Sequence, residues 1–104
     1  MDLHLHGKKV LVTGASQGIG EGLAEIFAEE GCALHLVARS AARLGSLAER
    51  LRRDHGVAVA VQEQDITAPG AIDAILDAAG RIDVLVNNAG AIPGGDLWQV
   101  EAES

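Results

Sequence analysis

A glycine-rich segment near the start of the sequence has the residue types and spacing of a loop that binds phosphate. From Thr13 to Gly20 it reads T-G-A-S-Q-G-I-G, a T-G-x-x-x-G-x-G pattern. Gly14 lets the chain turn sharply, Gly18 lets the backbone approach a diphosphate, and Gly20 lets a following helix pack closely on a strand. Free N–H groups at the start of such a helix attract the anion, and the Ser16 hydroxyl can add a hydrogen bond. The same glycines could instead serve only a tight turn.

The glycine segment is not the P-loop of an ATPase or GTPase, because no Lys-Ser or Lys-Thr pair follows its glycines. A methyltransferase that binds another adenosine ligand on a similar loop is a weaker alternative, since it would need an acid at the end of the second strand. A dinucleotide is therefore the ligand that the segment favours.

The end of the second apolar run, Ala38-Arg39-Ser40, bears on which dinucleotide would bind. In folds that take NAD, an acid at this place bonds the ribose hydroxyls, whereas NADP needs a cation for its 2′-phosphate. Ala38 stands where the acid would be, and Arg39 follows with a planar guanidinium suited to phosphate, with Ser40 able to assist. The pattern predicts NADP rather than NAD. Alternatively, Arg39 is a solvated residue in a turn and Ser40 only caps the next helix.

Apolar periodicity indicates which elements would position these segments. Short runs of apolar β-formers predict strands at 9–13, 34–38, 57–61 and 83–87. Apolar residues at helical spacing predict helices at about 18–30, 41–55 and 68–79. This alternation is typical of a parallel sheet with helical crossovers. Right-handed crossovers then give the strand order 3-2-1-4, with the first two helices on one face and the third on the other.

The first helix should pack through an apolar face, and the fourth strand should lack a neighbour. Ile19, Leu23, Ile26 and Phe27 recur at helical spacing and are expected to form that face. Residues 88–104 show little regular period, so we expect a loop there with a helical start near its end. The fourth strand would then be an uncovered apolar edge, and such edges are normally paired or covered. We therefore expect further sequence beyond Ser104.

A second motif, Asn87-Asn88-Ala89-Gly90, follows the fourth predicted strand. Together with the glycine segment it resembles the N-N-A-G and T-G-x-x-x-G-x-G motifs of the classical short-chain dehydrogenases/reductases. Asp65-Ile66-Thr67, after the third strand, is similar to that family's acidic residue and its neighbour that meet the adenine ring. The resemblance covers nearly the whole chain but only the first part of a family member. It implies that the cofactor is bound by Gly14, Ser16, Gln17, Gly18, Ile19, Gly20, Arg39, Ser40, Asp65, Ile66, Asn88, Ala89 and Gly90.

Several of these residues also have a purely structural interpretation. Asp65 could cap a turn after the third strand, and only the resemblance makes it an adenine contact. One of the side chains of Asn87 and Asn88 could tie the strands together while the Ala89-Gly90 backbone lies along the cofactor. His4 and His6 have no carboxylate or cysteine at ligand spacing, so we expect no metal site.

The residues that the family uses for catalysis cannot be assigned in this sequence. The family's chemistry uses a tyrosine as general acid/base, a lysine four residues later and a serine that holds the substrate oxygen. The sequence contains no tyrosine, so we assign no catalytic residue and leave open whether the isolated chain is an enzyme. Residues 1–104 are expected to be the N-terminal part of a single dinucleotide-binding domain, a truncated α/β doubly wound sheet of the Rossmann type.

The resemblance implies that the parent protein is an oxidoreductase that transfers hydride between nicotinamide and a carbonyl or alcohol. This chain would carry only the cofactor-binding part, with NADP preferred. The alternative is a non-catalytic dinucleotide-binding or sensor module that pairs with a partner chain. The resemblance also suggests a homo-oligomer, a dimer or tetramer, for the full-length protein.

Composition excludes other classes of function. The 104 residues are 48% hydrophobic and 22% charged, which suits one folded unit. A formal charge of −7 has the wrong sign for nucleic acid, and a single cysteine cannot form an internal disulfide. No apolar run approaches the ~20 residues of a membrane span, and the start of the chain has no leader-like stretch. We expect a cytoplasmic location and no membrane or nucleic-acid partner.

Overall fold

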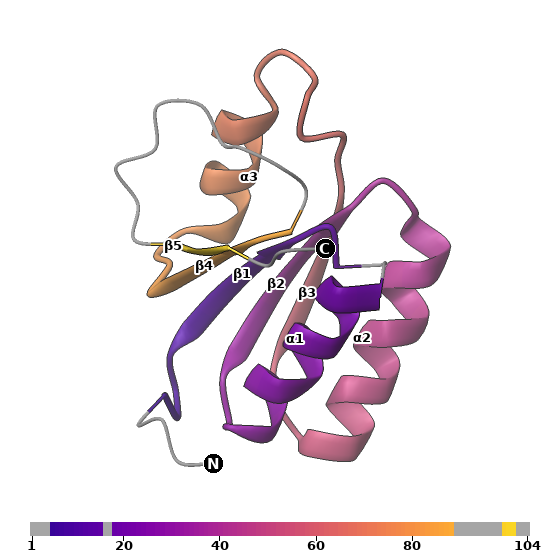
Figure 1. Ribbon diagram of the computed structural model, residues 1–104, viewed down its shortest axis with the longest axis vertical. Helices are drawn as coiled ribbons and strands as arrows, with labels where there is room; N and C mark the ends of the chain where they lie inside the picture. The colour runs from indigo at the N-terminus through magenta and orange to yellow at the C-terminus, as the bar shows by residue number, and fades with distance from the viewer. Residues whose placement is uncertain (1–4, 16–17, 89–98, 102–104) are drawn as a thin grey trace.

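The computed structural model is an α/β fold built on one parallel sheet, and it describes residues 5–15, 18–88 and 99–101 (Figure 1). The strands are β1 (Lys9–Thr13), β2 (Ala33–Ala38), β3 (Val59–Glu63), β4 (Val84–Asn87) and β5 (Gln99–Glu101). The helices are α1 (Gly18–Glu29), α2 (Ala41–His55) and α3 (Ala71–Ala79). The strand order is β3-β2-β1-β4-β5. The predicted order 3-2-1-4 is therefore confirmed, and β5 extends it by one strand.

Helices cover both faces of the sheet, as the crossover rule predicts. Figure 1 shows α1 and α2 side by side on one face and α3 on the opposite face. Successive side chains of a strand point to opposite faces, so Val10 and Val12 of β1 join one core cluster while Leu11 joins the other. Burial on both sides explains why β1 is an almost continuous apolar run.

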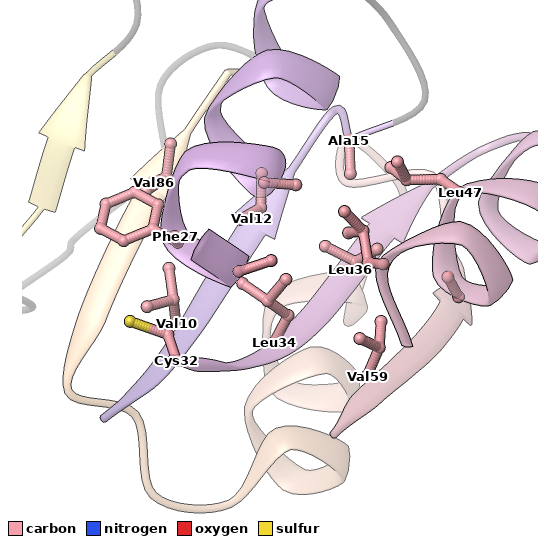
Figure 2. Packing of buried hydrophobic residues seen from close by; sticks show 14 of the residues in the cluster. Val10, Val12, Ala15, Phe27, Cys32, Leu34, Leu36, Leu47, Val59 and Val86 are labelled. Carbon is pink, nitrogen blue, oxygen red and sulfur yellow. The ribbon is translucent and has the colours of Figure 1, made fainter. Parts of the chain in front are cut away.

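The larger core cluster lies between the sheet and the pair α1 and α2. Figure 2 shows Val10, Val12, Leu34 and Leu36 of the central strands turned toward this side, with Phe27 of α1 close to Val86. The smaller cluster joins Leu11, Val37 and Leu85 of the sheet to Ile75 of α3. The two clusters bury both faces of the central strands β1, β2 and β4.

The buried face of α1 differs from the predicted one. The residues buried against the sheet are Gly20, Ala24, Phe27 and Ala28. The side chains of Ile19 and Ile26 are instead 42% and 39% exposed. Glycine and alanine let the helix axis approach the sheet closely, so small side chains rather than large ones define the contact. Of the expected face, only Phe27 is buried, with Leu23 packed at the margin of the cluster.

Pairing with β2 places β3 two residues later than its apolar run suggests. Val59 pairs with Leu34 and Glu63 pairs with Ala38, so the strand ends in polar residues. Residues 57 and 58 precede the strand, although the Ala58 carbonyl still accepts a hydrogen bond from Leu34 N at 2.9 Å. The third helix begins at Ala71 instead of 68, because Gly70 takes φ 77° at its N-terminal cap.

The expectation of an unpaired fourth strand is wrong. Residues 99–101 form β5, which pairs in parallel with β4 from Leu85↔Gln99 to Asn87↔Glu101. The helical start expected near the end of the chain is therefore not formed at these residues. Residues 89–98 and 102–104 lie outside the described part of the chain. A short strand without apolar periodicity is recognised only through its partner, which explains why the sequence pattern missed it.

None of the helices in the described residues has the length and apolar character needed to cross a membrane. Across the same residues, no group of three or more His, Cys, Asp and Glu side chains is placed to hold a metal ion.

Candidate functional site

A cavity of about 630 Å³ opens at the carboxyl ends of the strands. It lies at the end of β1, which is flanked by β2 on one side and by β4 on the other. The strand order reverses at this point, and ligands usually bind at such a point in open α/β sheets. The residues predicted from sequence that line it are Gly14, Arg39, Ser40, Asp65, Ile66 and Asn88. Parallel strands bring together residues that are up to 75 positions apart in the sequence.

The remaining predicted site residues do not line this cavity or are not described. Gly18 and Ile19 form the exposed start of α1, and Gly20 is buried with its Cα facing Gly14 and Asn88. Ser16, Gln17, Ala89 and Gly90 lie outside the described residues.

The glycine segment combines a left-handed turn with a close helix contact. Gly14 has φ 67°, a conformation that side-chain-bearing residues rarely adopt, and it turns the chain out of β1. A Cβ on Gly20 would overlap the Gly14 carbonyl oxygen and lie 2.8 Å from Asn88 Nδ2. A Cβ on Gly18 would meet no described atom within 4 Å. The absence of a side chain at Gly20 is thus required by the protein itself, whereas at Gly18 it leaves open space at the helix start.

Hydrogen bonds connect the glycine segment to the end of β4. The Thr13 hydroxyl donates to Asn87 Oδ1 at 2.9 Å and accepts from Asn88 N at 3.2 Å. The Asn88 side chain in turn donates from Nδ2 to the Gly14 carbonyl at 3.3 Å. Thr13 and Asn87 are almost completely buried, at 1% and 4% exposure. Asn87 therefore ties the strands together, as one interpretation of the sequence proposed, and Asn88 orients the turn at Gly14.

Thr13→Val is expected to lower the free energy of unfolding by about 1–2 kcal/mol. Valine has nearly the same shape, but it leaves the Asn88 N–H and Asn87 Oδ1 without the buried hydroxyl that each now contacts. Urea unfolding followed by circular dichroism measures the change. Thr13→Ser is the matched control, because it retains the hydroxyl and loses only a methyl group. Equal stability of the valine and wild-type proteins would contradict this role for the network.

Arg39 and Ser40 lie at the opposite side of the cavity, where β2 leads into α2. Ser40 is the N-cap of α2, and its Oγ accepts a hydrogen bond from Arg43 N at 3.4 Å. The capping interpretation of Ser40 is therefore correct, but it does not exclude ligand binding, because a hydroxyl that accepts one bond can still donate its own hydrogen. The Arg39 residue is exposed and borders the cavity. Ala38, which replaces the acid of NAD-binding folds, is buried.

Asp65 closes a turn after β3 and also lines the cavity. Its Oδ1 accepts from Thr67 Oγ1 at 2.7 Å and from Thr67 N at 2.9 Å. The pKa of Asp65 lies below its ordinary value, mainly because of these two Thr67 bonds, with a smaller contribution from the positive charge of Arg39. The carboxylate is consequently ionised at neutral pH and held in one orientation at the edge of the cavity. The capping role suggested by the sequence and a place at the site coexist.

Sequence reasoning did not assign several other residues of the cavity to the site, among them Arg43 and Thr13. Arg43, in the first turn of α2, borders the cavity together with Arg39. An arginine three residues after a capping serine and four residues after Arg39 is a signal that could have identified it. Thr13 is the first residue of the glycine motif, but no local pattern indicates its bonds to residues more than 70 positions away.

Comparison with known proteins identifies the family of the chain. A family model described as "short chain dehydrogenase" matches residues 8–104. An uncharacterized oxidoreductase of Staphylococcus saprophyticus is 40% identical over 90 residues, which cover 83% of this chain and 35% of the relative. The 11-beta-hydroxysteroid dehydrogenase 1A of Arabidopsis thaliana is 44% identical over 91 residues, covering 84% of this chain and 26% of that protein.

Solved structures show the same relationship. L-sorbose reductase from Gluconobacter frateurii, complexed with NADPH and L-sorbose, matches with a TM-score of 0.82 and 41% identity over 88% of this chain and 36% of that one. A short-chain dehydrogenase from Sphingobium yanoikuyae in complex with NADPH matches with a TM-score of 0.74 and 48% identity over 80% and 34%. This chain spans between 26% and 36% of the length of these relatives. The chain belongs to the short-chain dehydrogenase family and corresponds to the N-terminal portion of its members.

Proposed function

We propose that this chain is the cofactor-binding part of an NADP-preferring oxidoreductase that moves hydride between nicotinamide and a carbonyl or alcohol. The observation that carries the preference is the pair Arg39 and Arg43 on the cavity wall, on either side of the Ser40 cap, with Ala38 in place of an acid. Two structurally similar family members were solved with NADPH, which supports the same choice for this chain.

The residues at and around the cavity match the 2′-phosphate, the diphosphate and the adenine of that cofactor. The guanidinium of Arg39 and the Ser40 hydroxyl would hold the 2′-phosphate, because both donate hydrogen bonds and one carries a positive charge. The open start of α1 at Gly18 would take the diphosphate. Asp65 and the half-buried Ile66 would border the adenine. When bound, the nicotinamide supplies or accepts the hydride.

Proton transfer to or from the substrate would come from residues outside these 104, because the sequence has no tyrosine. The same fact favours a second candidate function, a non-catalytic dinucleotide-binding module that pairs with a partner chain. The intact mass of the natural gene product separates the two. A mass near the 10.7 kDa of this chain, in a soluble monomer, would argue against the proposal that the chain is part of a longer oxidoreductase.

The wild-type chain is expected to bind NADPH at least tenfold more tightly than NADH, because only NADPH carries the phosphate that Arg39 and Ser40 would contact. Isothermal titration calorimetry measures both dissociation constants. The fragments 2′,5′-ADP and 5′-AMP repeat the comparison without the nicotinamide half, and S-adenosylmethionine serves as a negative control. Equal affinities within each pair would refute the proposed preference.

A further inference from the structure

A carboxylate from β3 lies against the start of α2, next to the proposed phosphate site. Glu63 is the last residue of β3 and pairs with Ala38 of β2. Its Oε2 accepts a hydrogen bond from Ala41 N, the first residue of α2, at 3.1 Å. Glu63 therefore contacts the residue that directly follows the Ser40 cap. Neither the glycine segment nor the Asn87-Asn88 motif includes it.

This placement puts the negative charge of Glu63 close to Arg39 and Ser40, the groups that would bind the negatively charged 2′-phosphate. Consecutive Cα atoms are only about 3.8 Å apart, so a phosphate held by Arg39 and Ser40 would lie within several ångströms of a carboxylate bonded at Ala41. Charges of the same sign at that separation repel measurably even where water screens them. The Glu63 carboxylate also uses the Ala41 amide, which is consequently engaged by the protein and not by a ligand.

We propose that Glu63 is a specificity-determining residue that weakens binding of NADPH relative to NADH. The inference rests on the proposed function, since it assumes that the 2′-phosphate binds beside Arg39 and Ser40. Arg39 would attract the phosphate and Glu63 would oppose it, so the proposed preference for NADPH would be reduced by the Glu63 carboxylate. NADH has only ribose hydroxyls at this position and is nearly indifferent to the carboxylate.

Glu63→Gln tests the charge while retaining an oxygen that can accept from Ala41 N. We expect NADPH to bind about fivefold more tightly to this variant at low ionic strength, with the NADH affinity changed less than twofold. Because the Glu63 bond is exposed, the gain should shrink in 0.5 M salt, as expected for charges screened by solvent ions. A loosened helix start would instead affect both cofactors and would not depend on salt.

Two matched variants complete the experiment. Glu49→Gln removes the same charge from an exposed position further along α2 and should leave the NADPH/NADH ratio unchanged. Glu63→Asp retains the charge on a shorter side chain, so its ratio should remain near the wild-type value. A Glu63→Gln ratio equal to that of the wild type, in a wild-type chain that prefers NADPH, overturns the inference alone. A wild-type chain that binds both cofactors equally overturns the proposed function and this inference together.

Discussion

Gly20→Ala is expected to lower the free energy of unfolding by about 2 kcal/mol and to weaken NADPH binding on the order of tenfold or more. The new Cβ would overlap the Gly14 carbonyl and crowd Asn88 Nδ2 at 2.8 Å. Neither neighbour can easily move, because Asn88 Nδ2 donates to that same carbonyl and the Asn88 backbone is bonded to Thr13. The start of α1 must therefore shift away from β1, and with it the N–H groups that would bind the diphosphate.

The control is Gly22→Ala, two residues further along the same helix. A Cβ at Gly22 would meet no described atom within 4 Å, so only helix propensity acts there. Alanine is more favourable than glycine inside a helix by about 0.8–1 kcal/mol, and this variant should be more stable than the wild type. Guanidinium unfolding and calorimetric titration with NADPH measure both effects. If Gly20→Ala were as stable as Gly22→Ala, the claim that a side chain at position 20 clashes with the Gly14 carbonyl would be contradicted.

Arg39→Ala is expected to weaken NADPH binding about thirtyfold while leaving the NADH affinity within twofold of wild type. Hydrogen bonds between ionised groups contribute about 1.5–3 kcal/mol, and 2 kcal/mol corresponds to roughly this factor in the dissociation constant. The residue is exposed at the cavity wall and lies outside the core clusters, so its removal should not unfold the chain. The preference for NADPH should largely disappear.

Two further variants make the result for Arg39 specific. Arg39→Lys retains the charge but loses the planar fork, and its NADPH affinity should fall between those of wild type and Arg39→Ala. Arg53→Ala removes an exposed arginine near the far end of α2, where it contacts Asp54, and should change neither affinity. A parallel loss of NADPH and NADH binding in Arg39→Ala would show that Arg39 acts on the loop and not on the phosphate.

The strand order and most element bounds could be predicted from the sequence. β1 and α2 have the predicted bounds, because an apolar β run and a helical repeat are local properties of the chain. The order 3-2-1-4 follows from the handedness of the crossovers, which is a general property of parallel sheets. The convergence of Gly14, Arg39, Asp65 and Asn88 on one cavity follows from the same order, since the carboxyl ends of parallel strands share an edge.

Details that depend on contact with a neighbouring strand or helix could not be predicted from the sequence. Periodicity shows that α1 is a helix, but Gly20 and Ala24 face the sheet and Ile19 does not, because the distance to β1 decides which side chains fit. The polar end of β3 and the short β5 are strands only through their pairing with β2 and β4. A search for apolar runs cannot detect either of them.

The sequence by itself determined the order of the first four strands, the glycine turn at Gly14 and the arginine that follows Ala38, because each depends on local residue types or on chain handedness. Only the tertiary structure decided that Thr13 bonds to Asn87 and Asn88, that Arg43 shares the cavity with Arg39, and that Glu63 bonds to Ala41. Such contacts join distant parts of the chain or depend on the orientation of a helix. Their energies depend on distances that arise only when the strands are assembled side by side.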